Sequence, residues 1–200
     1  MVVAGVVLAG GAGRRMGGLD KAALQVGGIA LLDRVLAAAR PVCDRLVVVG
    51  PTRPTDVADV EFVREAVPGG GPVPAIIAGV DAAGPECDVV LLLAVDLPLL
   101  TAVHLRHLVA ALGHAGAGAA VSAEEDGPNP LLAAYRMSDL SARAAGLGPG
   151  APARRLLPAD PVMIDLGAAG LNVNRPEDLT VAEILAANDD QPPRSAPKTP

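Results

Sequence analysis

The chain has 200 residues, of which 51% are hydrophobic, 1% aromatic and 19% charged, and its formal net charge is −6. This length suits one α/β domain with a sizeable core, and the apolar content excludes disorder of the whole chain. The negative charge argues against a surface for nucleic acid or an anionic membrane, and the low aromatic content argues against a stacking platform for single strands.

Targeting and redox signals are sparse. No basic region precedes the apolar start of the chain, and no apolar run reaches the roughly 18 residues that a membrane span needs. Cys43 and Cys87 lack the spacing of a metal site and are too few for a disulfide scaffold. We therefore predict a cytoplasmic protein with reduced thiols and with no nucleic-acid or membrane partner.

Short apolar runs alternate with helical patterns along the chain. In chain order we expect a strand at 2–8, a helix at 29–40, strands at 45–49 and 60–63, a helix at 74–83, a strand at 88–95, a helix at 102–114, strands at 116–123 and 130–135, helices at 138–145 and 151–157, a strand at 162–166 and a helix at 176–187. This alternation indicates an α/β fold with a single doubly wound, mostly parallel, Rossmann-like sheet and helices on both faces. We assign residues 1–187 to this domain and predict that residues 188–200, which lack an apolar pattern and are rich in proline, form a disordered tail.

The first predicted strand leads into a loop that is rich in glycine and then in positive charge. The loop glycines are Gly10, Gly11, Gly13, Gly17 and Gly18. Glycines just after a strand allow a tight turn in which several backbone N–H groups converge and attract an anion. Arg15 and Lys21 follow, and the chain has only one other lysine, Lys198. We predict a phosphate-binding loop with Lys21 as a compact point charge; the alternative is a solvated surface lysine.

Two other glycine-rich loops fit these residues less well. A P-loop needs Ser or Thr after its lysine, but Ala22 follows Lys21. A dinucleotide-binding loop needs a small residue at its last position, where this chain has Met16, and an acid after the second strand, where none occurs. A dinucleotide-dependent oxidoreductase is therefore disfavoured.

The strand expected at 88–95 is followed by an acidic residue, Asp96. In open α/β sheets, ligands bind beyond the carboxyl ends of the strands. If this strand lies beside the first one, Asp96 faces the phosphate loop and can hold Mg²⁺, which proteins bind through one or two carboxylates together with substrate phosphates. The alternative is that Asp96 only caps a turn before Pro98.

The segment LAGGAGRRMGGLDK at 8–21 resembles the L-A-G-G-x-x-x-R-M-G-x-x-D-K opening of the MobA-like nucleotidyltransferases. The segments GGGP at 69–72, DLPLL at 96–100 and NVNRPEDL at 172–179 resemble further motifs of that family. The resemblance implies a sheet of the nucleotidyltransferase type, Mg²⁺ as cofactor, and transfer of GMP from GTP to molybdopterin with release of pyrophosphate. It also implies transient contact with proteins that insert or deliver the molybdenum cofactor.

The resemblance assigns the nucleotide site to the glycine loop and two later segments. The nucleotide-binding residues it implies are Leu8, Ala9, Gly10, Gly11, Gly13, Arg15, Lys21, Glu65, Gly71 and Asp96; Arg15, Lys21 and Asp96 are the catalytic ones, and Asp96 holds the metal. Two positions depart from the family pattern: Glu65 stands near the place of a usual acid, and Gly50 replaces a frequent Asn. Both lie in the base- and sugar-recognition region, so a cytidylyltransferase acting on molybdopterin and a non-catalytic nucleotide-binding homologue stay open as alternatives.

The second half of the chain carries the residues that the resemblance places near a phosphorylated pterin acceptor. They are Asn129, Arg154, Arg155, Asn172 and Asn174. The Asn amides could orient the acceptor, and two adjacent arginines could bind its terminal phosphate. The alternatives are that Asn174 caps the last helix and that the arginines lie on a solvated helix face.

Overall fold

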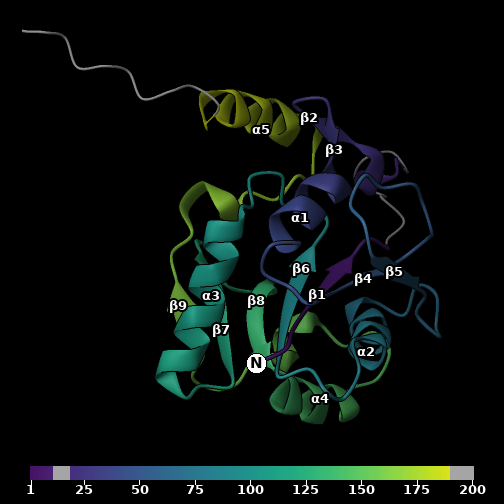
Figure 1. The fold of residues 1–200 in the computed structure, drawn as a ribbon, viewed down its shortest axis with the longest axis vertical. Coiled ribbons are helices and arrows are strands. Elements are labelled where there is room, and N and C mark those ends of the chain that lie inside the picture. The colour runs from purple at the N-terminus through teal and green to yellow at the C-terminus, as the bar shows by residue number, and fades with distance from the viewer. Residues whose placement is uncertain (11–18, 190–200) are drawn as a thin grey trace, which may run out of the picture.

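The computed structural model describes residues 1–10 and 19–189, and its centre is a seven-stranded sheet (Figure 1). In the order β5-β4-β1-β6-β8-β7-β9, the strands are Val60–Val63, Arg45–Val49, Val3–Leu8, Val89–Ala94, Gly127–Arg136, Ala119–Glu124 and Val162–Ile164. β8 runs antiparallel to its neighbours β6 and β7, whereas the other paired strands of this sheet are parallel. The predicted α/β fold with a mostly parallel sheet is confirmed.

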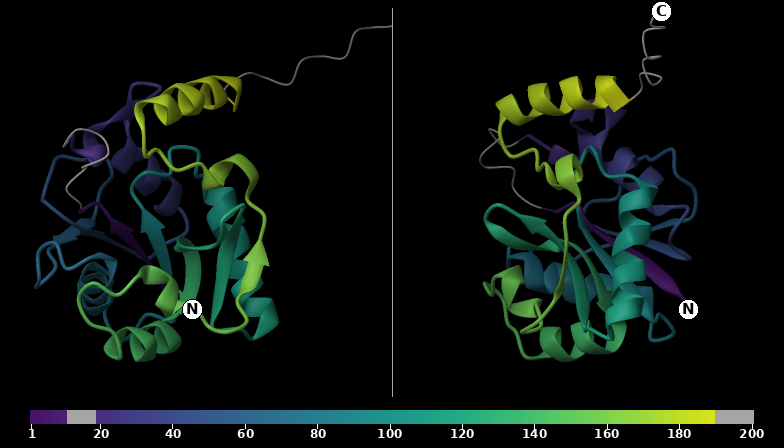
Figure 2. Two further views of the ribbon diagram at one scale, coloured as in Figure 1. Left: turned by 180° about the vertical axis from the view of Figure 1, so that it is seen from behind. Right: turned by 90° about the vertical axis from the view of Figure 1, so that its left-hand side faces the viewer.

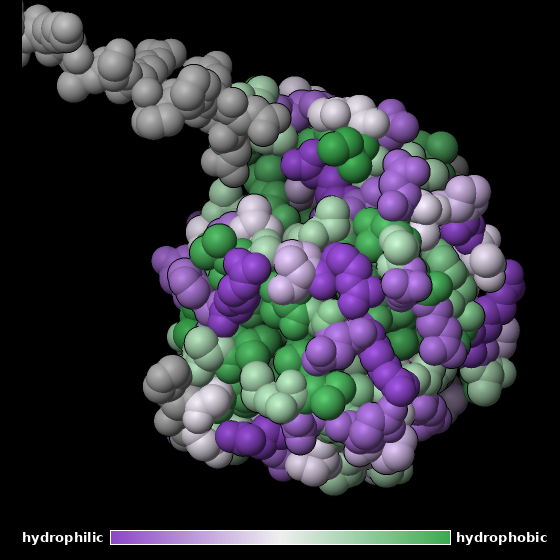
Figure 3. Space-filling view, viewed as in Figure 1, coloured by the Kyte–Doolittle hydropathy of each residue, from purple (hydrophilic) through white to green (hydrophobic). Residues whose placement is uncertain are grey.

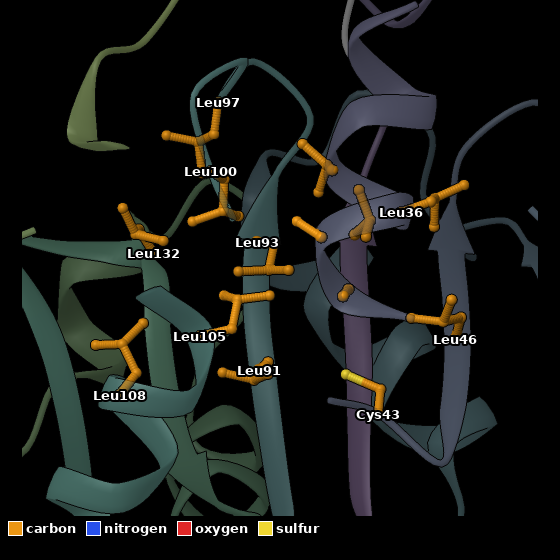
Figure 4. Close-up of a cluster of buried hydrophobic side chains, with 14 of the residues drawn as sticks. Leu36, Cys43, Leu46, Leu91, Leu93, Leu97, Leu100, Leu105, Leu108 and Leu132 are labelled. Atoms are coloured by element: carbon orange, nitrogen blue, oxygen red, sulfur yellow. The ribbon is translucent and has the colours of Figure 1, made fainter. Parts of the chain in front are cut away.

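Helices cover both faces of this sheet (Figure 2). One face is covered by α1 (Leu31–Ala39) and α3 (Ala102–Ala115), and the other by α2 (Pro72–Ala83), α4 (Met137–Ala145) and the short 3-10 helix η3 (Ala153–Leu156). Leu91 and Leu93 of β6 pack on the first face with Leu36 of α1 and Leu105 of α3 (Figure 4). Leu92 belongs to the core on the opposite face, because successive side chains of a strand alternate.

A third, smaller apolar cluster holds the C-terminal helix α5 (Pro176–Asp189) beside a two-stranded hairpin, β2 (Gln25–Val26) and β3 (Ile29–Ala30). Its buried members are Val26, Leu31, Leu99, Val173, Ala182 and Ala186. α5 lies outside the two helix layers, next to β2 and β3 (Figures 1 and 2). The chain between η4 (Gly167–Gly170) and α5 therefore has to pass the end of β6.

The hairpin corrects the prediction of a helix beginning at Ile29. Gly27 and Gly28 both have positive φ, 62° and 74°, which is the backbone that a two-residue type I′ hairpin turn requires. The helix therefore begins at Leu31, after β3 has paired with β2. A Gly-Gly pair between two short segments was the sequence signal for this turn.

Other boundaries shift for local reasons. α2 begins at Pro72, two residues earlier than predicted, because proline suits the first turn of a helix. β8 is ten residues long and starts at Gly127, because it pairs with β7 through a tight turn in which Glu124 faces Gly127. The segment predicted as a helix at 151–157 is the four-residue 3-10 helix η3.

The last helix extends to Asp189, two residues beyond its predicted end, so residues 188 and 189 are helical and do not belong to a disordered tail. Residues 190–200 of that predicted tail lie outside the described residues. None of the helices in the described part of the chain is long and apolar enough to cross a bilayer. On the face seen in Figure 3, hydrophilic and hydrophobic side chains are interspersed.

Candidate functional site

The carboxyl ends of β1, β4 and β6 meet at one edge of the sheet. Leu8 pairs with Val49 of β4 on one side and with Ala94 of β6 on the other. The amide of Ala9 donates to the carbonyl of Val49 at 2.9 Å, and the amide of Val95 donates to the carbonyl of Leu8 at 3.2 Å. Strands β1 and β6 are thus neighbours, so the start of the glycine loop and Asp96 leave the sheet side by side.

Three predicted site residues come together at this edge. The ammonium of Lys21 donates to Asp96 Oδ2 at 2.7 Å and to Asn174 Oδ1 at 2.8 Å. The side chains of Lys21 and Asp96 are only 21% and 14% exposed, so water screens this ion pair weakly. The pairs span 75 and 153 positions of sequence, and only the fold brings them into contact.

Backbone contacts hold two of these residues in place. The amide of Val173 donates to the carbonyl of Asp96 at 2.9 Å, which fastens the segment before α5 to the end of β6. The Asp178 carboxylate accepts the amides of Asn174 and Arg175 at 2.7 and 2.8 Å. Because Asp178 caps the start of α5, the Asn174 side chain is available to Lys21 rather than acting as the helix cap that the sequence offered as an alternative.

Lys21 opens the 3-10 helix η2 (Lys21–Ala23), and its predecessor organises that turn. Asp20 accepts the amide of Ala22 at 3.2 Å and forms an ion pair with Arg53, whose side chain is 15% exposed. Sequence reasoning did not select Arg53, which lies in the irregular segment after β4. The ion pair between Asp20 and Arg53 therefore holds the segment after β4 against the residue that precedes Lys21.

The remaining oxygen of Asp96 tests whether the site suits a divalent cation. Asp96 Oδ1 is buried and has no hydrogen-bond partner among the described residues. A buried carboxylate oxygen without a partner costs free energy, and carboxylate oxygen is a preferred Mg²⁺ ligand. No group of three or more His, Cys, Asp or Glu side chains is arranged for a metal within residues 1–10 and 19–189. A single carboxylate such as Asp96 fits the usual Mg²⁺ site in which substrate phosphates supply further ligands.

Glu65 lies at the start of the glycine loop on the β5 side of the sheet. Its Oε1 accepts the amide of Gly69 at 3.2 Å, and its Oε2 lies 3.5 Å from where a Cβ on Gly10 would stand. Gly71 caps α2 with φ 86°, a conformation that favours glycine. A Cβ on Gly50 would lie 2.9 Å from the carbonyl carbon of Ala9, so glycine at this position permits the close approach of the chain after β4 to the chain after β1.

The predicted residues Gly11, Gly13 and Arg15 lie outside the described residues. Arg154 and Arg155 are both exposed on η3, which packs against β8 and α4. Within the described ranges, no hydrogen bond or ion pair joins either guanidinium to the group of Lys21, Asp96 and Asn174.

The other two predicted acceptor residues converge on a carboxylate that sequence reasoning missed, Glu124. The Asn129 amide donates to Glu124 Oε1 at 2.6 Å and accepts the amide of Leu131 at 2.8 Å. The Asn172 amide donates to the carbonyl of Gly170 at 2.9 Å. A carboxylate at a strand end was the signal that selected Asp96, and the strand predicted at 116–123 stops one residue short of Glu124.

The surroundings of Glu124 disfavour its charge. Burial raises the pKa of the Glu124 carboxyl above its ordinary value, whereas hydrogen bonds from Asn129 and Asn172 act to lower the pKa. The negative charges of Asp126 and Asp96 raise the pKa further. Glu124 is thus a half-buried acid close enough to Asp96 to be affected by its charge.

Gly10, which begins the glycine-rich segment, lies with Lys21 and Asp96 at the carboxyl edge of a mostly parallel sheet, and this chain is an enzyme of the nucleotidyltransferase class. Residues 5–162 match the family described as the MobA-like NTP transferase domain, and the chain belongs to this family.

Similar proteins agree with this assignment. The chain is 34% identical over 194 residues to the "Molybdenum cofactor guanylyltransferase" of Cereibacter sphaeroides, a match that covers 92% of this chain and 97% of that one. It is 36% identical over 135 residues to the "Probable molybdenum cofactor guanylyltransferase" of Haloferax mediterranei, covering 64% of this chain and 62% of that relative. The crystal structure of "Molybdopterin-guanine dinucleotide biosynthesis protein A" from Archaeoglobus fulgidus shares the fold, with a TM-score of 0.71, 24% identity, and coverage of 92% of this chain and 99% of that one.

Proposed function

We propose that this enzyme transfers GMP from GTP to molybdopterin and releases pyrophosphate. The observation that carries the proposal is the Lys21 ammonium, held between Asp96 and Asn174 at the sheet edge where the glycine loop begins. The name of the Cereibacter sphaeroides relative, which matches along nearly its whole length, supports the choice of donor and acceptor.

In the proposed reaction, an oxygen of the acceptor's phosphate forms a bond to the α-phosphorus of GTP while the bond to the β-phosphate oxygen breaks. Arg15 and the amides of Gly10, Gly11 and Gly13 bind the leaving pyrophosphate, and Leu8 and Ala9 bring the backbone to it. Lys21 stabilises charge at the α-phosphate. The acceptor phosphate is already ionised at neutral pH, so no general base is needed.

We propose Asp96 as the protein ligand of Mg²⁺, because its Oδ1 is buried and lacks a partner within the described ranges. When bound, Mg²⁺ supplies Lewis-acid stabilisation of phosphate oxygens. Asp96 also orients Lys21 through Oδ2, and Asn174 holds the ammonium from the other side. The Asp96 carboxylate would thus position the Lys21 ammonium through Oδ2 and bind Mg²⁺ through Oδ1.

We propose that the Glu65 carboxylate recognises the guanine base of GTP. Guanine presents a ring N–H and an amino group side by side, and a carboxylate accepts two such parallel donors. Glu65 lies beside Gly10 and Gly69, and Gly71, two residues after Gly69, is the N-cap of α2. The pterin acceptor is proposed to lie on the opposite side of Asp96, near Asn129 and Asn172.

A nucleotide panel tests this proposal. We expect GTP with Mg²⁺ to raise the melting temperature more than CTP, ATP or UTP, and GTP with molybdopterin to release pyrophosphate. Stabilisation by CTP alone would indicate a cytidylyltransferase. Binding of GTP without pyrophosphate release would indicate a non-catalytic homologue. The cytoplasmic location, the absence of nucleic-acid and membrane partners and the transient contact with cofactor-delivery proteins stay predictions.

A further inference from the structure

We propose that Glu124 recognises the pterin ring of the acceptor, by accepting hydrogen bonds from its amino group and the neighbouring ring N–H. This inference rests on the proposed function, because it takes molybdopterin as the acceptor. Glu124 lies outside the sequence motifs of the family. In this inference Asn129 and Asn172 position Glu124 and do not bind the acceptor themselves.

The side chains of Asn129 and Asn172, the two predicted acceptor amides, are engaged inside the protein. Asn129 donates to Glu124 Oε1 and accepts from the Leu131 amide, so both ends of its side chain have partners. Asn172 donates to the carbonyl of Gly170 at 2.9 Å, and Gly170 lies beside Glu124 Oε1. These amides therefore position a carboxylate, and Glu124 is the group they present.

Three separate segments of the chain meet at the Glu124 carboxylate. Glu124 ends β7, Asn129 lies in β8, and Gly170 and Asn172 belong to the chain before α5. A Cβ on Gly170 would stand 3.4 Å from Glu124 Oε1, so the chain before α5 is in van der Waals contact with the carboxylate.

The charges around Glu124 favour a ligand that brings hydrogen-bond donors. Glu124 is half-buried and forms no ion pair with the residues that the structure describes, while Asp126 and Asp96 act on it with like charge. Such a group repels phosphate, so it does not bind the phosphate end of the acceptor. It favours a ligand that brings N–H donors, and the 2-amino-4-oxo edge of a pterin offers two of them in parallel.

Guanine carries the same amino-pyrimidinone edge, and the sheet order separates the two heterocycles. Glu65 follows β5, Asp96 follows β6, and Glu124 ends β7, so in the order β5-β4-β1-β6-β8-β7 the two glutamates flank Asp96. Transfer of GMP to the acceptor phosphate places one heterocycle on each side of the reacting phosphates. Glu65 therefore belongs to the guanine of GTP, and Glu124 to the pterin.

The test compares two fluorescent probes, pterin and lumazine. Lumazine differs from pterin in that an oxygen replaces the 2-amino group. We expect the wild-type protein to bind pterin at least about tenfold more tightly than lumazine, the factor expected for one hydrogen bond to a charged group. In Glu124→Gln the amide lacks the charge and one acceptor, and the preference should fall below about threefold. The matched control is Glu125→Gln, because Glu125 is the exposed neighbour in the β7–β8 turn and should leave the preference unchanged.

A kinetic measurement separates recognition from a structural role. With GTP and molybdopterin, Glu124→Gln should raise the KM for molybdopterin by about tenfold to a hundredfold and leave the KM for GTP unchanged. A fall in kcat with both KM values unchanged would overturn the inference, as would equal binding of pterin and lumazine by the wild type, or no binding of pterin.

The same variants show whether the inference or the proposed function has failed. GTP and ITP, which lacks the amino group, are titrated with Mg²⁺ into the wild type and Glu124→Gln. Loss of the preference for GTP over ITP in Glu124→Gln would show that Glu124 binds the guanine base, and it would overturn the inference. If the wild type prefers pterin but does not bind GTP, the proposed donor is wrong and the pterin site stands. If GTP binds normally and pterin is not preferred, only the inference is wrong.

Discussion

At the scale of single residues, Lys21 shows how a functional group depends on its neighbours. Asp20 caps the short helix that Lys21 opens, and Asp96 and Asn174 accept hydrogen bonds from the ammonium. A compact ammonium can donate to two oxygens that lie in different directions, whereas a planar guanidinium presents its donors in a fixed fork. The chain uses arginine for most other positive charges, which underlines the particular demand at this position.

Replacing Lys21 by Ala should lower the rate of pyrophosphate release by at least about a hundredfold, because it removes positive charge where negative charge develops in the transition state. Lys21→Arg should not restore the rate. The measurement is pyrophosphate release from GTP and molybdopterin under saturating conditions. The control is Lys198→Ala, which removes the only other lysine. An unchanged rate in Lys21→Ala would contradict the role of this residue.

Glu65→Gln should weaken the preference for GTP over ITP, from about tenfold to about threefold or less, because the amide replaces one of the two acceptors of the carboxylate. Binding of both nucleotides with Mg²⁺ is measured by calorimetry. Glu61→Gln, an exposed change on β5, is the matched control. Retention of the full GTP preference by Glu65→Gln would show that another group reads the base.

Glu124 should make the folded state less stable as the pH rises. Burial raises the pKa of its carboxyl above the ordinary value of 4.5, so above that pH the folded chain binds more protons at this position than the unfolded chain. Its contribution to the free energy of unfolding is therefore most favourable below pH 4.5 and is lost as the pH rises through the raised pKa. Urea unfolding between pH 4 and 8 measures the free energy of unfolding of the wild type and of Glu124→Gln, and we expect the difference between the two to change with pH. A pH-independent difference would contradict it; Glu125→Gln is the control.

At the scale of elements, the helix–sheet contacts depend on where glycine permits close approach. Gly79 of α2 lies over β1 and β4, and a Cβ there would stand 2.3 Å from Val6 Cγ1 and 3.0 Å from Val49 Cγ2. Gly27 and Gly28 determine the β2–β3 hairpin in another way, through their positive φ. Glycine therefore acts at two elements through different properties: the absence of a side chain and the freedom of the backbone.

Gly79→Ala should lower the free energy of unfolding by about 1–3 kcal/mol, because the added methyl group forces α2 away from β1. Gly113→Ala is the matched control: Gly113 lies in α3 with no atom within 4 Å of an added Cβ. This control should be neutral or stabilising by about 0.5–1 kcal/mol, because alanine is the better helix former. Urea denaturation of both variants measures the difference, and equal effects would contradict the close contact.

At the scale of the whole molecule, β8 determines how the second half of the sheet meets the first. It runs antiparallel between β6 and β7, so its first residues, including Asn129, lie at the carboxyl edge of β6. The chain before α5 then crosses the same edge, where the Val173 amide binds the Asp96 carbonyl. The proposed nucleotide side and the proposed acceptor side of the site are therefore built from strands on opposite sides of Asp96.

Much of the fold followed from local patterns in the sequence. Apolar runs located the strands β1, β4, β5 and β6 within a residue or so, because buried strands contain few polar residues. The glycine loop, Lys21 and Asp96 stood out through motif and position, and the mostly parallel architecture followed from alternating elements. Asn129 and Asn172 were selected by resemblance, but the sequence did not reveal what they hold.

Only the tertiary structure decided which of these residues meet. The contacts of Lys21 with Asp96 and Asn174 span 75 and 153 positions. Glu124 meets Asn129 and Gly170 because β7 pairs with β8 and the chain before α5 passes beside them. The physical reason is that the types and spacing of residues in a segment predict only the hydrogen bonds and the burial within that one element. Strand order, the direction of β8 and the packing of α5 depend on the burial of the whole core, which no single segment encodes.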